Sequence, residues 1–416
     1  MIESVQPTGR DVSIAHGRLS EVSSADLDSD TRVVILRDDE GRYFAAPALG
    51  NADRRAEPGD GAAEALVRRV VGPARLDAGF EVTHWDGHVC AGESRVTVDQ
   101  TNESVIIGDC AVVKWTIELE SGPHPAPARL ATLVSAGFMG MPRPWGVLTW
   151  RPSPSEAPRL VATVTEYIPG ASDGWTWAVD DVRTALSSGS DGGVRAAAQR
   201  LGTLVAQMHA ALAAAGRTTL NGASAAQLCS DAHDELDAAV ALTPGDEGER
   251  LRARADHLHT VLDRVGDAAG DALIDVHGDL HVGQILRAGD RYAVNDFDGN
   301  PVLEPGERLR RQPAATDVAG MLQSLDNVGH VVVRRTEGVD PETVSRLTAL
   351  ARDVFLDAYR VTLSERNASD LLDESLLLPL RIRQICREYL YAAKHLSRWL
   401  YVPDAALRGL DDMKGA

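Results

Sequence analysis

The stretch "VHGDLHVGQILRAGDRYAVNDFDGNP", residues 276–301, decides the fold, because it sets polar side chains at fixed intervals between apolar, strand-like segments. Asp279 begins a loop, Gln284 follows it, and the strand-like "RYAVND" ends at Asp296. Phosphoryl transfer needs a carboxylate for the acceptor hydroxyl and metal ions that bridge the phosphates. Mg²⁺ prefers oxygen ligands such as carboxylates. The stretch therefore predicts a site for phosphoryl transfer.

The order of these three residues also matters. Protein kinases carry a base aspartate, an amide ligand five positions later and a downstream D-F-G aspartate. A purely structural alternative is that H-G-D forms a turn and that Asp296 caps a strand. His277 and His281, four residues apart, could form a zinc pair, but Gly278 and the loop context lack the helical face of H-E-x-x-H. We interpret His281 as a residue that orients the loop by hydrogen bonding.

The motif "HGDLHVGQIL…VNDFDGNP" resembles the aminoglycoside phosphotransferase and choline kinase-like superfamily of small-molecule kinases. Gln284 in place of the usual asparagine is similar to the actinobacterial maltokinases, as are three other segments: "VDQTNESVIIGDCAVVKW" (98–115), "TEYIPGASDGW" (165–175) and "ATDVAGMLQSLDNV" (315–328). The variant D-F-D-G-N-P and the tail "REYLYAAKHLSRWLYVPDAAL" (387–407) resemble the glucosamine kinases of that group. The resemblance covers residues 90–330 well and the ends loosely.

This resemblance implies an α+β, bilobal protein kinase-like fold. We expect an N-terminal cap over 1–90, a sheet-rich nucleotide-binding lobe over 91–168 and a mostly helical lobe over 169–416. The sequence pattern agrees, because β-branched and polar residues alternate over 94–119. Apolar residues recur at helical spacing over 194–215, and 249–269 reads as a second amphipathic helix.

Carried over by residue, the resemblance makes Asp279 the catalytic base. Gln284 and Asp296 would bind Mg²⁺, with Asp298 as a further carboxylate. It also implies ATP as the phosphoryl donor. The residues implied to contact the nucleotide are Lys114, a phosphate-covering loop with Gln100, Asn102 and Ser104, and a hinge of Glu166, Tyr167 and Ile168.

The chain departs from its relatives near Lys114. In relatives a glutamate on the next helix often pairs with this lysine, but the aligned stretch "GPHPAPARLATLV" (122–134) has Ala128 and Arg129 there. Either Glu118 or Glu120 pairs with Lys114, or the lysine is held differently.

Asp317 precedes the apolar pattern "VAGMLQSL", which we expect to be helical. Two roles are open for it. It is either an N-cap of that helix or a brace for the catalytic loop together with Arg308 or Arg311.

A tail helix over 381–400 presents a stripe of candidate sugar-binding side chains. Glu388, Tyr391, His395 and Trp399 are spaced by three, four and four residues, so a helix places them on one face. The stripe either lines a pocket that faces Asp279 or packs into the core. A carboxylate in a pocket suits an ammonium group, which glucosamine carries and maltose lacks.

The resemblance thus implies an ATP-dependent enzyme that phosphorylates the 6-hydroxyl of glucosamine, with Asp279 and His281 near the sugar. The alternatives are phosphorylation of maltose at its anomeric hydroxyl, phosphorylation of an aminoglycoside, and a catalytically inactive kinase-like binding module. A metal-dependent hydrolase with the same carboxylates is a further alternative, which Lys114 and the hinge-like "TEYIPG" argue against.

Composition sets the remaining expectations for the 416-residue chain. Its net charge of −19 argues against nucleic acid as a partner. No stretch approaches 18 apolar residues, and the N-terminus lacks a signal pattern, so we expect no membrane span. The four cysteines form no C-x-x-C pair, which argues against a disulfide framework or a zinc knuckle. We expect a cytoplasmic monomer whose partners are a small sugar and ATP.

Overall fold

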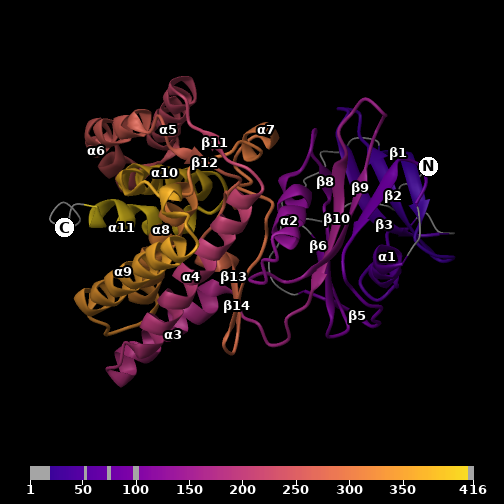
Figure 1. Ribbon diagram of the computed structural model, residues 1–416, viewed down its shortest axis with the longest axis horizontal. Coiled ribbons are helices and arrows are strands. Elements are labelled where there is room, and N and C mark those ends of the chain that lie inside the picture. The colour runs from indigo at the N-terminus through magenta and orange to yellow at the C-terminus, as the bar shows by residue number, and fades with distance from the viewer. Residues whose placement is uncertain (1–18, 51–53, 73–75, 97–102, 411–416) are drawn as a thin grey trace. The chain divides into compact units, whose positions relative to one another are not determined.

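The computed structural model describes residues 19–50, 54–72, 76–96 and 103–410. They form two compact units (Figure 1). The first takes in the described residues up to Val134 with 141–170 and 305–309, and the second takes in 135–140, 171–304 and the rest from Arg310. The first unit is built mainly from strands and the second mainly from helices, which confirms the expected α+β class.

Two antiparallel sheets form the first unit. The four-stranded sheet has the order β1 (Ser20–Asp26), β2 (Thr31–Arg37), β3 (Tyr43–Leu49), β8 (Glu118–Leu119). The six-stranded sheet has the order β4 (Phe80–His84), β9 (Pro144–Trp150), β10 (Arg159–Glu166), β7 (Ala111–Trp115), β6 (Glu103–Ile107), β5 (Glu93–Arg95). Strands from before and after residue 90 share both sheets. The expected boundary between a cap over 1–90 and a nucleotide-binding lobe over 91–168 stays a prediction.

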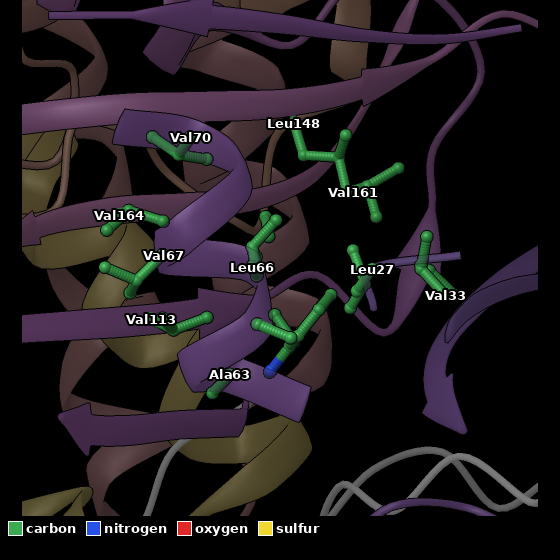
Figure 2. Packing of buried hydrophobic residues seen from close by; sticks show 14 of the residues in the cluster. Leu27, Val33, Ala63, Leu66, Val67, Val70, Val113, Leu148, Val161 and Val164 are labelled. Atoms are coloured by element: carbon green, nitrogen blue, oxygen red, sulfur yellow. The ribbon is translucent and has the colours of Figure 1, made fainter. Parts of the chain in front are cut away.

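The core of this unit joins both sheets through helix α1 (Ala62–Val71). Figure 2 shows Leu66 and Val67 of this helix near sheet residues such as Val113 and Leu148. Full burial of each such side chain contributes about 1.5–3 kcal/mol. Gly61 has no side chain to cap α1, and the Glu93 carboxylate of β5 accepts the exposed backbone N–H groups of the first turn instead. Two further helices, α2 (Pro125–Ser135) and α7 (Pro305–Arg308), complete the unit.

Helices dominate the second unit. They are α3 (Gly174–Ser188), α4 (Gly192–Ala214), α5 (Gly222–Leu242), α6 (Gly245–Leu262), α8 (Ala315–Arg335), α9 (Pro341–Glu365), α10 (Leu377–His395) and α11 (Tyr401–Gly409). The strands are β11 (Thr218–Thr219) with β12 (Ala272–Leu273), and the hairpin β13 (Ile285–Ala288) with β14 (Arg291–Val294). The 3₁₀ turns are η1 (Asp263–Asp267), η2 (Val282–Gln284), η3 (Ser369–Leu371), η4 (Glu374–Leu376) and η5 (Ser397–Trp399).

Small residues allow these helices to approach closely. A Cβ atom at Gly202 of α4 would lie 2.2 Å from the Phe355 carbonyl oxygen of α9.

The helix expected over 249–269 ends at Leu262 and continues as the 3₁₀ turn η1. Within the described ranges, we find no helix whose length and apolar character suit a bilayer crossing.

Candidate active site

Asp317 of α8 holds the start of the loop that carries Asp279. Its carboxylate accepts the His277 N–H at 2.7 Å and the Gly278 N–H at 2.9 Å. Helix α8 has Ala314 as its N-cap, so the structure contradicts the N-cap alternative for Asp317. The loop-bracing alternative is correct, but backbone amides take the place of the expected arginine partners. Asp317 is only 1% exposed, so these bonds are shielded from water.

Two further buried residues complete this anchor. His209 of α4 places Nε2 3.0 Å from the Asp317 carboxylate and Nδ1 2.7 Å from the Tyr359 hydroxyl of α9. Burial alone would raise the pKa of Asp317, but the bond and charge of His209, with smaller help from His277 and the Gly278 N–H, hold it below its ordinary value. Asp317 is thus an ionised anchor for the loop.

The same face of α8 packs against the rest of the loop. Ser324 Oγ accepts the Val282 N–H at 2.9 Å. A Cβ atom at Gly320 would lie 2.5 Å from the Leu280 carbonyl oxygen, and one at Gly174 of α3 would lie 1.7 Å from the Val282 carbonyl oxygen. Residues 317, 320 and 324 are three and four apart, so they face the loop together. The loop is therefore held between α8 and the start of α3.

His277 positions the backbone of Asp279. Its Nδ1 accepts the Asp279 N–H at 3.3 Å, and its Nε2 lies 2.9 Å from the Asn295 carbonyl oxygen, which makes Nε2 the protonated nitrogen. Burial raises the pKa of the Asp279 carboxyl and outweighs the opposing charges of His281 and His277. A carboxylate with a raised pKa is a better proton acceptor.

The hairpin β13–β14 brings the expected metal ligands together. Ile285 pairs with Val294, and the Asn295 N–H donates to the Gln284 carbonyl oxygen at 2.8 Å. Gln284 and Asp296 therefore leave the same end of the hairpin. Asp296 has φ of 64°, a left-handed conformation that is rare for a residue other than glycine and costs of order 1–3 kcal/mol.

A strained backbone conformation such as that of Asp296 persists only where the surrounding structure holds the residue in place. Asp298, half-buried, follows two residues later. Gln284, Asp296 and Asp298 offer only oxygen donors, the type that Mg²⁺ prefers. The donor chemistry of these three residues thus fits the expected metal ion.

His281 caps the 3₁₀ turn that carries Gln284. Its Nδ1 accepts the Gly283 N–H at 3.0 Å, and its ring lies 6.0 Å from the ring of Trp175. Burial lowers the pKa of His281, although the charge of Asp279 opposes the shift. An uncharged His281 with Nδ1 as acceptor has its Nε2–H left as a donor.

Lys114 and Ser104 stand opposite each other on neighbouring strands of the first unit. The register pairs Lys114 of β7 with Ser104 of β6 and Thr163 of β10. Gln100 and Asn102 lie outside the described residues. Lysine occurs in the whole chain at 114, 394 and 414 alone, while arginine is abundant.

The partner of Lys114 remains a prediction. Helix α2 reads PAPARLATLVS and carries no acidic residue. Glu120 accepts a hydrogen bond from Arg308, and Glu118 is exposed at β8. Arg129 of α2 donates to the Arg308 carbonyl oxygen at 2.8 Å.

The expected hinge follows β10 directly. The Glu166 N–H donates to the Arg143 carbonyl oxygen and the Tyr167 N–H donates to the Cys110 carbonyl oxygen, each at 2.7 Å. Ile168 is buried, and no hydrogen bond joins its N–H to another described residue. This N–H is the kind of backbone donor that a nucleobase can use.

The expected sugar-binding stripe is only partly formed. Helix α10 ends at His395, and Trp399 lies in the following turn η5, so the four residues do not share one helical face. Leu396 leaves the helical conformation with φ of −145°, and Trp399 instead packs against the core and stands 5.6 Å from the Arg335 guanidinium. Tyr391 is 43% exposed and its ring lies 5.1 Å from that of His395.

Glu388 differs from these exposed neighbours. Its carboxylate accepts from the Asn327 side-chain amide of α8 at 2.9 Å. Burial raises the pKa of Glu388 to about 7, against the opposing hydrogen bonds of Asn327 and Gln384 and the charge of Arg381. Glu388 is a buried carboxylate that a nearby cation would hold in its ionised form.

Sequence reasoning missed a charged group near Asp279. Arg383 and Arg387, one turn apart on α10, each donate two hydrogen bonds to Glu235 of α5 at 2.8–3.0 Å. Burial would raise the pKa of Glu235, yet the two arginines lower it to about 2. Arg387 is also close enough to lower the pKa of Asp279. The signal in the sequence was the i,i+4 arginine pair next to Glu388.

Comparison with known proteins shows the family to which the chain belongs. A glucosamine kinase from Streptacidiphilus jiangxiensis is 51% identical over 399 residues, which cover 92% of this chain and 90% of that protein. The chain belongs to the glucosamine kinase family. A second glucosamine kinase, from Mycolicibacterium smegmatis, is 44% identical over 404 residues, 94% of this chain and 98% of that protein. No protein-family model matches the chain.

Solved structures of glucosamine kinase agree with the family assignment. One crystal form superposes with a TM-score of 0.85 at 48% identity and covers 95% of this chain and 94% of that one. Another structure, glucosamine kinase in complex with glucosamine, ADP and inorganic phosphate, has a TM-score of 0.82 at 48% identity, again covering 95% and 94%. The family's fold is therefore the fold of this chain.

Proposed function

We propose that the protein transfers the γ-phosphoryl group of ATP to the 6-hydroxyl of D-glucosamine. The observation that carries this proposal is the braced loop that holds Asp279 near Asp296, in a chain 51% identical to a glucosamine kinase. A related structure with glucosamine, ADP and phosphate supports both the sugar and the nucleotide.

Asp279 is proposed as the general base. It takes the proton of the 6-hydroxyl as that oxygen forms a bond to the γ-phosphorus, while the bond from the γ-phosphorus to the leaving ADP oxygen breaks. General-base catalysis of this kind contributes roughly 10²–10⁴-fold. The His277 bond to the Asp279 N–H and the Asp317 anchor keep the carboxylate in position. Arg387 adds positive charge near the reacting groups.

Gln284 and Asp296, with Asp298 as a further carboxylate, would hold Mg²⁺, which supplies positive charge to the phosphates when bound. The hairpin register and the left-handed Asp296 support this assignment. His281 is proposed to orient the loop and to donate its Nε2–H towards the acceptor.

The residues proposed to bind the nucleotide belong to the first unit. Lys114 is proposed to contact the phosphates, with Gln100, Asn102 and Ser104 from the loop before β6. Glu166, Tyr167 and Ile168 would offer backbone groups to adenine. The buried Ile168 with an N–H that has no described partner supports the hinge proposal.

Glu388 is proposed to bind the sugar ammonium. A buried carboxylate with a pKa raised to about 7 gains most from a cation beside it. Tyr391, His395 and Trp399 stay predictions as sugar-binding residues. A cytoplasmic setting and a monomeric state also stay predictions, and the free cysteines at 90, 110, 229 and 386 support the first of them.

The experiment replaces Asp279 by asparagine. We expect turnover of glucosamine with ATP and Mg²⁺ to fall at least ~10²-fold, while the affinity for a fluorescent ATP analogue stays within threefold. Asp290→Asn is the matched control, because its side chain is 95% exposed in the β13–β14 turn. Turnover by Asp279→Asn near the wild-type rate would remove Asp279 as the base.

A further inference from the structure

A second cluster of metal-ligand side chains lies on α5 and at the end of α6. Cys229 and His233 are four residues apart on α5, so they lie on one face. Asp263 begins η1 directly after α6 ends at Leu262. The ligand atoms of these three residues all lie within 4.8 Å of one another. We propose that Cys229, His233 and Asp263 bind a zinc ion that ties α5 to the α6–η1 junction.

The ligand chemistry selects zinc over magnesium. A thiolate, an imidazole and a carboxylate are the ligands that zinc takes, with water in the fourth position, whereas Mg²⁺ keeps to oxygen. His233 Nε2 and Asp263 Oδ1 are 3.1 Å apart. Tetrahedral ligands with bonds of about 2.0 Å stand roughly 3.3 Å from each other. Two of the three ligands therefore already have nearly the separation that the ion needs.

A hydrogen-bond chain behind His233 supports the same site. His233 Nδ1 lies 2.6 Å from His259 Nδ1, and His259 Nε2 lies 3.2 Å from Asp237 Oδ1. With zinc on His233 Nε2, each bond has one donor: His233 Nδ1–H donates to His259, and His259 Nε2–H donates to Asp237. Metal-binding histidines usually donate their other N–H to such a partner, which orients the ring.

Without the ion, the same contacts need an additional proton. His233 Nε2 must then donate to Asp263, His259 Nε2 must donate to Asp237, and a further proton must lie between the two Nδ1 atoms. Zinc on His233 Nε2 removes the need for this additional proton.

The position of the cluster suits an ion that arrives from solvent. The Asp263 and Asp237 side chains are 69% and 70% exposed. The Cys229 sulfur lies 3.6 Å from the Leu262 carbonyl oxygen and 4.0 Å from that of Asp263, and it accepts a hydrogen bond from the Gly266 N–H, which favours the thiolate form that binds an ion. Glu235, which holds the arginine pair of α10, is also on α5, so the ion would steady that helix.

Cobalt provides a direct test, because a thiolate bound to Co²⁺ gives a charge-transfer band that an all-oxygen site cannot give. The full chain, stripped with a chelator, is titrated with Co²⁺ and then with Zn²⁺. We expect a band that saturates at one equivalent and disappears when zinc displaces cobalt. Cys90→Ser and Asp296→Asn should keep the band, since these residues lie outside the cluster.

Variants within the cluster decide the assignment. Cys229→Ser should lose the band, and His233→Gln should weaken cobalt and zinc binding at least tenfold. His259→Ala should weaken zinc binding about 10–100-fold, as expected for a partner behind a ligand. Circular dichroism confirms that each variant is folded, and His233→Gln is the test if Cys229→Ser does not fold. A wild-type protein without the band, or a band unchanged by both ligand variants, would overturn the proposal.

Discussion

Replacing Asp317 by asparagine tests how the loop that carries Asp279 is held. The carboxylate receives the His277 N–H, the Gly278 N–H and a contact from His209 Nε2. An asparagine amide has only one oxygen, so its NH₂ group would face at least one of these donors. The change keeps the size of the side chain and removes the charge and an acceptor.

The expected cost follows from these bonds. A hydrogen bond to a charged group contributes about 1.5–3 kcal/mol, and a buried donor left without a partner adds to the loss. We therefore expect a loss of unfolding free energy on the order of 3 kcal/mol and, in a chain of this size, a Tm lower by roughly 3–6 °C. The loop start would also loosen two residues before Asp279, so kcat for glucosamine should fall more than KM changes.

The pH dependence has a definite sign. Because the pKa of Asp317 is lowered in the folded state, the carboxylate contributes its full stability above the ordinary aspartate value of 3.8. This contribution is lost as the pH falls through the folded-state pKa. The wild type should therefore exceed Asp317→Asn in stability at pH 7, and the two should converge in acid.

Thermal unfolding followed by circular dichroism, with kinetics at fixed ATP, measures both effects. Asp353→Asn is the control, since Asp353 is exposed on α9. An Asp317→Asn variant with unchanged Tm and unchanged kcat would refute the account of the anchor. A lower Tm with unchanged kcat would leave Asp317 a stability role only.

Three other changes have defined outcomes. Gly320→Ala puts a Cβ atom 2.5 Å from the Leu280 carbonyl oxygen, so Tm and kcat should fall by an amount equivalent to about 1–3 kcal/mol, while Gly193→Ala, with nothing within 4 Å, should leave kcat unchanged. Glu388→Gln removes a buried carboxylate whose pKa is raised to about 7, so the Tm of the variant should exceed that of the wild type at pH 8 but not at pH 5. The KM of the variant for glucosamine should rise. An equal Tm difference at both pH values would contradict the raised pKa of Glu388. Glu235→Gln leaves two buried arginines without their carboxylate, and a loss of about 3–5 kcal/mol in urea unfolding is expected; a loss below about 1 kcal/mol would show that the arginines find other partners.

The central motif could be predicted because its parts are close in sequence. Asp279, Gln284 and Asp296 span a single loop and hairpin, and the turn at 289–290 between β13 and β14 suffices to bring them to one end. The strands of the first unit were also visible from alternation, as β7 shows with buried Ala111, Val113 and Trp115. Local spacing carried both predictions.

The anchor could not be predicted in the same way. His209 and Asp317 are 108 residues apart, and His209 and Tyr359 are 150 apart. A buried polar contact between distant helices leaves no periodic pattern in either helix. The placement of Trp399 failed for another reason: no glycine or proline announces the end of α10 at His395, so the helical spacing was extended too far.

ADP release with ATP and Mg²⁺, measured across glucosamine, N-acetylglucosamine, glucose, maltose and kanamycin, is the decisive measurement for the proposed acceptor. We expect turnover with glucosamine and little with glucose or the N-acetylated sugar, because these two sugars lack the free ammonium group that the Glu388 carboxylate is proposed to bind. Turnover of maltose or kanamycin in preference to glucosamine would contradict the proposed acceptor, and no turnover with any of the five would contradict the proposed kinase activity.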